Sequence, residues 1–325
     1  MQDCEAAKAQ VEVEELHFDS GWRGKRIRTW VWVPPAGVPV RGVLQIAHGM
    51  VEHAFRYDDF ARFLAAHGFA VAANDHIGHG ASAGNSEAIG KLPVDGGTIM
   101  IDDANALHLI MRERHPSVPY FVFGHSMGSF IMRAYIAAYG EELSGAVICG
   151  TGHQPAILTS PAAWLARCVA ATRGWDYRSG FLHSMGIGGY SASVGHPRTQ
   201  FDWLSTDPAM VDAYIADPAC GAMFSAGGYA SLFGLVHTAS SQACADAVPA
   251  GFPVLLVAGG EDPVGAKGKG VRAAAVALGK RARVTCKLYD GMRHEILNEP
   301  DHMHVYADIL AWLDSICAAA ERGAR

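Results

Sequence analysis

Short runs of apolar residues alternate with longer helical patterns along most of this chain, and this alternation constrains the fold more than any other feature. Six runs have the length and composition of buried strands: 42–47, 69–73, 120–123, 145–149, 253–258 and 284–289. A seventh run, RIRTWVWV at 26–33, alternates as a half-exposed strand does. Apolar strands separated by helices are typical of a mostly parallel sheet with helices on both faces.

Helical periodicity predicts helices over 57–67, 95–115, 126–139 and 301–320. The alternation of strands and helices stops between His153 and Val248. This stretch is rich in glycine and aromatic residues and has no clear buried strand. We therefore expect an α/β core built from 1–152 and 249–325. The stretch 153–248 is expected to be an insertion that covers one end of the sheet, with a separate small domain as the alternative.

Composition narrows the classes of function. Half of the 325 residues are apolar and 18% are charged, which suits a packed core and not a disordered chain. A net charge of −6 without a Lys/Arg block argues against nucleic acid as a partner. Seven cysteines without a CxxC pair favour reduced thiols. Because the N-terminal residues are acidic and no apolar stretch reaches the roughly 20 residues of a membrane span, we expect a cytoplasmic protein.

Residues 124–128 read Gly-His-Ser-Met-Gly and match the G-x-S-x-G pattern of a nucleophile elbow. The pattern alone is weak in a chain with 37 glycines, but it directly follows a predicted strand and opens a predicted helix. Such a strand–turn–helix strains the serine backbone and leaves room only for glycine on either side. We predict Ser126 as a nucleophile at the carboxyl end of the sheet, with an ordinary turn serine as the alternative.

A serine nucleophile needs a base, and the base needs a carboxylate. His294 follows the last predicted strand and precedes the last helix, which places it at the same sheet edge as Ser126. Asp262 follows the preceding strand, and the order Ser, Asp, His is that of α/β-hydrolases. Glu261 and Asp290 are rivals for the acid, although Asp290 shares a short turn with the histidine and is poorly placed to reach its Nδ1.

Acyl transfer also needs two backbone donors for the oxyanion. We assign them to the N–H groups of Met127, directly after the serine, and of Met50, in the loop after the strand 42–47. This chemistry needs no cofactor and no metal. The glycines from Gly78 to Gly84 have the wrong spacing for a dinucleotide loop. Two histidine pairs lack a third metal ligand with matching context: His76 with His79 and His302 with His304.

Together these motifs resemble the monoacylglycerol lipase and lysophospholipase branch of the α/β-hydrolases, a family also described as serine aminopeptidase S33-like. The resemblance covers nearly the whole chain and is carried by six segments: 48–57, 75–82, 124–128, 201–205, 217–221 and 289–295. It implies the triad and both oxyanion donors assigned above. Val51 departs from the family, in which many members have glycine, and Ser129 stands where the elbow usually continues with glycine.

The resemblance implies a serine ester hydrolase for single-chain lipids such as monoacylglycerols or lysophospholipids. The aromatic content of 153–248 supports an apolar tunnel for the acyl chain. The helical stretch 160–173 presents Trp164 and its neighbours for transient contact with a membrane surface, or for packing within the insertion. A short-chain esterase, an aminopeptidase of the same fold and a non-catalytic ligand receptor are the alternatives.

Overall fold

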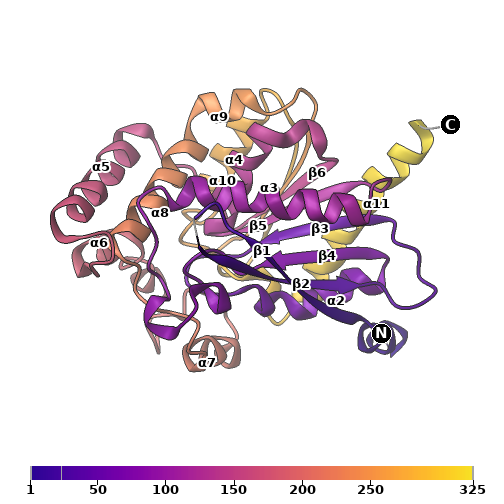
Figure 1. Ribbon diagram of the computed structural model, residues 1–325, viewed down its shortest axis with the longest axis horizontal. Coiled ribbons are helices and arrows are strands. Elements are labelled where there is room, and N and C mark those ends of the chain that lie inside the picture. The colour runs from indigo at the N-terminus through magenta and orange to yellow at the C-terminus, as the bar shows by residue number, and fades with distance from the viewer. Residues whose placement is uncertain (1, 23, 324–325) are drawn as a thin grey trace.

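An eight-stranded sheet forms the centre of the computed structural model, which describes residues 2–22 and 24–323. The strands lie in the order β1-β2-β4-β3-β5-β6-β7-β8 (Figure 1). Their bounds are β1 Glu12–Asp19, β2 Arg26–Val33, β3 Gly42–Ala47, β4 Phe69–Asn74, β5 Tyr120–His125, β6 Gly145–Cys149, β7 Pro253–Gly259 and β8 Arg283–Tyr289. All pairs from β4 to β8 along this order are parallel, whereas β2 pairs antiparallel with both β1 and β4.

The mostly parallel sheet confirms the predicted fold class, and all seven predicted strands are present. Sequence analysis assigned no strand to β1. This strand pairs with β2 from Glu12 opposite Val33 to Asp19 opposite Arg26, and it stands at the edge of the sheet. Its four acidic side chains break the apolar pattern by which a strand is recognised in a sequence. Charged residues are nevertheless usual on an edge strand, because they discourage pairing with another chain.

Helices cover both faces of the sheet (Figure 1). The helices α2 (Asp58–Ala66) and α11 (His302–Gly323) share one hydrophobic core. The opposite core contains residues of α3 (Gly96–Arg114), α4 (Met127–Tyr139) and α10 (Lys269–Leu278). Successive residues of β5 enter the two cores in turn, because side chains alternate along a strand. The four predicted helices appear as α2, α3, α4 and α11.

Five helices lie between β6 and β7: α5 Ala156–Arg173, α6 Gly180–Gly186, α7 Pro208–Ala216, α8 Ala226–Ser240 and α9 Gln242–Ala247. Figure 1 shows α5, α6 and α7 gathered at one end of the molecule, beyond the sheet. We call residues 153–248 the cap. Its division from the core at these residues stays a prediction.

Arg133 of α4 is a buried cation, only 1% exposed, that forms no salt bridge within the described residues. Its guanidinium donates to the carbonyl of Gly152 at 2.7 Å, just beyond β6, and to the carbonyl of Ala239 near the end of α8. Burial lowers the pKa of Arg133 to about 10, so the side chain remains charged at neutral pH. The Arg133 side chain therefore connects the residue directly before the cap with α8, the last long helix of the cap.

Candidate active site

Ser126 joins β5 directly to α4 and has a left-handed φ of 54°. Its N–H donates to the carbonyl of Cys149 at 3.0 Å. A Cβ atom on Gly128 would lie 2.0 Å from the carbonyl oxygen of Ala47, and one on Gly124 would lie 2.3 Å from that of Gly128. Only glycine fits at either position. The backbone strain predicted for Ser126 is therefore present, and strain of this kind is concentrated at functional sites.

His294 and Asp262 meet at the carboxyl ends of β8 and β7. The Nδ1 atom of His294 lies 3.0 Å from Oδ1 of Asp262, and both side chains are almost completely buried. The same carboxylate oxygen accepts the N–H of Val264 at 2.9 Å, which fixes its orientation. The Nε2 atom of His294 is buried and has no hydrogen-bond partner among the described residues, Ser126 included. Nε2 is the atom that a base of this type uses.

The two rival carboxylates lie elsewhere. Glu261 is half-exposed and pairs with Lys267 at 2.6 Å. Asp290 is exposed at the turn that follows β8. Within the described chain, neither of them forms an ion pair with His294. Of the three candidates, the structure therefore brings only Asp262 to the imidazole.

The loop after β3 is held by contacts on both of its sides. The N–H of Gly49 donates to Oε1 of Glu52 at 2.5 Å. Val51 is buried with a left-handed φ of 50°, which is unusual for a β-branched residue. Its carbonyl accepts the hydroxyl of Tyr214 at 3.1 Å and the N–H of Gly221 at 3.0 Å, both from the cap. The cap thus holds the residue that follows Met50.

Both predicted oxyanion donors line the same pocket as Ser126. No hydrogen bond to the described residues uses the backbone N–H of Met50. Met127 is the first residue of α4, so its N–H has no carbonyl of its own helix to bind. The two N–H groups are therefore available to an acceptor in the pocket.

A buried network of charges links this loop to the loop that carries His294. Arg56 donates through Nη1 to Glu52 at 2.5 Å and through both terminal nitrogens to Glu295 at 2.7 Å. Burial is the largest influence and would raise the pKa of each carboxyl group, but Arg56 together with His125 outweighs it, and both pKa values are lowered. The two carboxylates therefore stay ionised, and they fix the positions of both loops relative to each other.

His125, the variable residue of the elbow, belongs to this network. Its Nδ1 lies 3.5 Å from Glu52, and its Nε2 lies 3.3 Å from the carbonyl of His294. Burial is the largest influence and opposes the charged form, but the hydrogen bond with Glu52 and the charges of Glu52 and Glu295 together outweigh it, so the pKa of His125 is raised. His125 therefore connects the loop of Glu52 with the loop of His294.

The cap also reaches the histidine loop. The ring of Trp203 lies 5.0 Å from that of His294, measured between centroids. The N–H of Glu295 donates to the carbonyl of Leu204 at 2.7 Å. Arg293 donates to the carbonyls of Asp202 at 2.6 Å and Ser205 at 2.9 Å. Cap residues therefore support the loops of Met50 and His294 alike.

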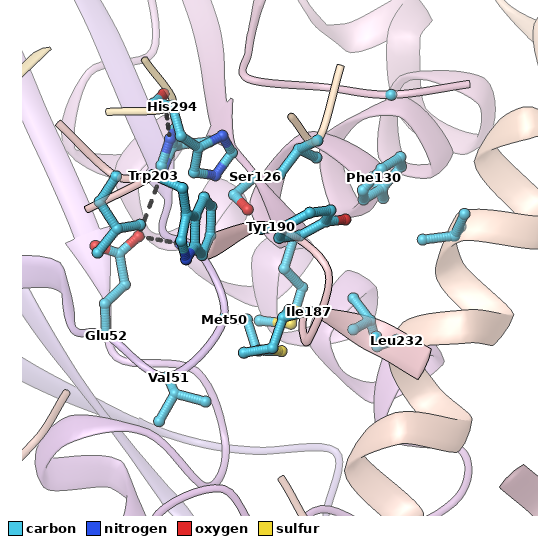
Figure 2. Close-up of a pocket in the computed structure, with 18 of the residues that line it drawn as sticks. Met50, Val51, Glu52, Ser126, Phe130, Ile187, Tyr190, Trp203, Leu232 and His294 are labelled. Carbon is cyan, nitrogen blue, oxygen red and sulfur yellow. Dashed lines mark hydrogen bonds and ion pairs between the residues drawn. The ribbon is translucent and has the colours of Figure 1, made fainter. Parts of the chain in front are cut away.

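Four of the predicted site residues line a pocket of about 450 Å³, which is within the usual range for a small-molecule site: Met50, Ser126, Met127 and His294. Figure 2 shows Ser126 among the labelled residues of this pocket, between His294 and Tyr190 in this view. Most of the remaining wall is apolar and comes from α4 and the cap; it includes Phe130, Leu158, Ile187, Leu232, Phe233 and Val236. Polar groups are concentrated near Ser126, so the pocket has a reactive end and an apolar body.

Known proteins resemble this chain over most of its length. The family model described as serine aminopeptidase, S33, matches residues 38–301, which is most of the chain. The chain belongs to this family. This assignment confirms the resemblance drawn from the sequence motifs.

Several named proteins are similar to this chain over most of its length. A monoacylglycerol lipase of Mycolicibacterium smegmatis is 32% identical over 301 residues, which cover 92% of this chain and 96% of the relative. The human monoglyceride lipase is 27% identical over 88% of this chain and 86% of its own length. A thermostable carboxyl esterase from Bacillus coagulans, solved with glycerol, superposes with a TM-score of 0.88 at 31% identity, over 94% of this chain and 99% of the esterase.

Sequence reasoning gave no role to Glu52, Arg56 or Glu295, although all three lie in segments that carried the family resemblance. The available signal was a glutamate close to each predicted catalytic loop, Glu52 after Met50 and Glu295 after His294. The pairing itself could not be found, because Arg56 and Glu295 are separated by 239 positions in the sequence.

His76 and His79, which the sequence did not favour as metal ligands, form a buried cluster with His48. The ring centroids of His48 and His76 are 4.1 Å apart, and those of His48 and His79 are 5.1 Å apart. The Nε2 atoms of His76 and His79 are buried without a hydrogen-bond partner among the described residues. Burial lowers the pKa of His76 to about 3 and that of His79 to about 4. These two rings are neutral at physiological pH.

Proposed function

We propose that this protein is a serine hydrolase that cleaves carboxylic esters of single-chain lipids, with monoacylglycerols as the first substrate class to test. The observation that carries the proposal is one pocket in which Ser126 and His294 stand at the reactive end of a mostly apolar wall. The relatives named monoacylglycerol lipase support the substrate class.

In the proposed mechanism, Oγ of Ser126 attacks the ester carbonyl while Nε2 of His294 takes its proton. The carboxylate of Asp262 orients the imidazole and stabilises its charged form. The negative oxygen of the tetrahedral intermediate accepts the N–H groups of Met50 and Met127. The imidazolium then protonates the leaving alcohol, and water cleaves the acyl-enzyme by the same path. Apart from the substrate and water, these steps use only groups of the chain.

The acyl chain is proposed to lie along the apolar wall supplied by α4 and the cap. Each methylene that leaves water for this wall contributes about 0.8 kcal/mol to binding. The glycerol or other alcohol part stays at the end lined by Glu52 and Glu295. On this view the cap residues 153–248 set the length of chain that is accepted.

The outer surface of the cap supports contact with lipid aggregates. Four large apolar side chains of α5 and α6 are more than half exposed: Ile157, Leu158, Trp164 and Phe181. Large exposed apolar side chains of this kind are candidates for protein or membrane contact. Within the described residues, no helix has the length and apolar character to cross a bilayer. We propose a transient interfacial contact through this surface.

Replacing Ser126 by alanine tests the nucleophile. Hydrolysis of monoacylglycerols and p-nitrophenyl acyl esters is expected to fall at least a thousandfold, and labelling by a fluorophosphonate probe should disappear. Ser315→Ala, on the exposed side of α11, is the matched control. Residual activity near the wild-type rate would refute the assignment.

A substrate series separates the alternatives. A lipase of this kind prefers longer acyl chains, whereas a short-chain esterase is fastest on acetyl and butyryl esters. Turnover of amino-acyl anilides without turnover of esters would indicate a peptidase. Correctly folded protein that neither labels nor hydrolyses any ester would indicate a ligand receptor.

A further inference from the structure

Three metal-ligating side chains meet where the cap contacts the loop of Met50. One ligand atom from each of His53, Asp217 and Cys220 lies within 4.8 Å of the other two. Nε2 of His53 is 2.8 Å from Oδ2 of Asp217. All three residues are partly exposed, so an ion can reach them from solvent. His53 is separated from Asp217 by 164 positions, and for this reason sequence spacing did not reveal the cluster.

The donor set and its local order favour an ion of the zinc class. Nitrogen, sulfur and carboxylate oxygen together are typical of Zn²⁺ sites, and three protein ligands leave a fourth position for water. The other carboxylate oxygen of Asp217, Oδ1, accepts the N–H of Ala219 at 2.8 Å. The N–H of Cys220 donates to the backbone carbonyl of Asp217 at 3.0 Å. The turn that presents two of the ligands is therefore already ordered.

The charges around the cluster are compatible with a bound cation. Arg56 brings a positive charge to this region, with its guanidinium 4.9 Å from the ring centre of Tyr214. That charge is paired by the two carboxylates of Glu52 and Glu295. When Asp217, which pairs with His53, is included, three carboxylates and one guanidinium lie in this region. The neighbourhood therefore carries a net negative charge and favours a divalent cation.

We propose that His53, Asp217 and Cys220 bind a zinc-class divalent ion that fastens the cap to the loop of Met50. Tetrahedral bonds of about 2.1 Å place ligand atoms roughly 3.4 Å apart, so modest rotations of the three side chains complete the site. The ion reinforces the contact that Gly221 and Tyr214 already make with Val51. The site is independent of the hydrolysis proposed above, because none of its ligands takes part in that reaction.

Cobalt titration of the chelator-treated full-length protein tests the site. One equivalent of Co²⁺ is expected to give the near-ultraviolet absorption of a cobalt thiolate, and Zn²⁺ should displace it. Cys220→Ser should abolish this band, while His53→Gln should weaken binding about tenfold or more. Cys286→Ser is the control, because Cys286 is exposed on β8, outside the cluster, and its loss should leave the band unchanged.

Alkylation of the wild-type protein provides a second readout that needs no variant. Zn²⁺ should slow the reaction of Cys220 with iodoacetamide severalfold, as measured by peptide mass spectrometry, and should leave Cys286 unaffected. A missing cobalt thiolate band, a band that survives in Cys220→Ser, or equal alkylation of Cys220 with and without Zn²⁺ would overturn the proposal. Ester hydrolysis is measured separately, so failure of one proposal does not affect the other.

Discussion

Replacing His79 by asparagine isolates one buried imidazole and should change how the protein responds to acid. The His79 ring is inaccessible to solvent, and its Nδ1 lies 2.8 Å from the carbonyl of Ile77. An asparagine amide can donate to the same carbonyl, so the substitution keeps that hydrogen bond while it removes the titrating group. The neighbouring rings of His48 and His76 remain in both proteins.

The magnitude follows from the pKa of about 4 to which burial lowers His79. Between about pH 6.5 and pH 4, the unfolded chain protonates this imidazole and the folded protein does not. The unfolded state therefore binds one more proton, and the free energy of unfolding falls as pH falls. One proton corresponds to about 1.4 kcal/mol per pH unit, so His79 removes about 2 kcal/mol between pH 7 and pH 5.

Urea unfolding followed by tryptophan fluorescence measures this quantity at pH 7, 6 and 5. The loss of unfolding free energy between pH 7 and pH 5 should be about 2 kcal/mol smaller in His79→Asn than in the wild type. His79→Gln should show the same pH-dependent difference, even though its stability at pH 7 differs from that of His79→Asn. Parallel pH curves for the wild type and both variants would refute the reasoning.

Three further predictions concern the loops around Ser126 and the cap surface. Glu52→Gln should lower kcat tenfold to a hundredfold in an ester assay, because Arg56 loses a partner and the loop of Met50 loses its anchor. Tyr214→Phe removes one hydrogen bond to Val51, worth about 1 kcal/mol, and should lower kcat about fivefold in the same assay. Trp164→Ser should weaken binding to phosphatidylcholine vesicles severalfold in a sedimentation assay, because an exposed apolar contact is lost.

Each of these predictions has its own control. For Glu52→Gln, an unchanged kcat would show that the loop keeps its geometry without the carboxylate. For Tyr214→Phe, added Val51→Gly should restore part of the activity, since glycine tolerates a positive φ without help. For Trp164→Ser, hydrolysis of a soluble acetate ester should remain at the wild-type rate, and equal vesicle binding would contradict an interfacial role.

The sequence predicted the parts of this protein that depend on local pattern. Buried strands such as Phe69–Asn74 are recognisable because they are almost entirely apolar, and Ser126 because glycines must flank it. Pairings between distant segments were not predictable. The carbonyl of Val51 accepts a hydrogen bond from Tyr214, which is 163 positions away in the sequence. No local pattern around Val51 indicates that contact. The acidic edge strand β1 was missed because its pairing to β2, and not burial, holds it in place.

The buried guanidinium of Arg133 has a consequence for exchanging the cap, residues 153–248, between homologues. It contacts the carbonyl of Gly152, before α5, and that of Ala239, near the end of α8. A chimaera whose junctions fall between these two positions keeps both acceptors, but its exchanged sequence must still supply the cap contacts to Val51 and to Arg293. Junctions placed outside them keep the buried charge satisfied only where the homologue's backbone brings its carbonyls to the same two places.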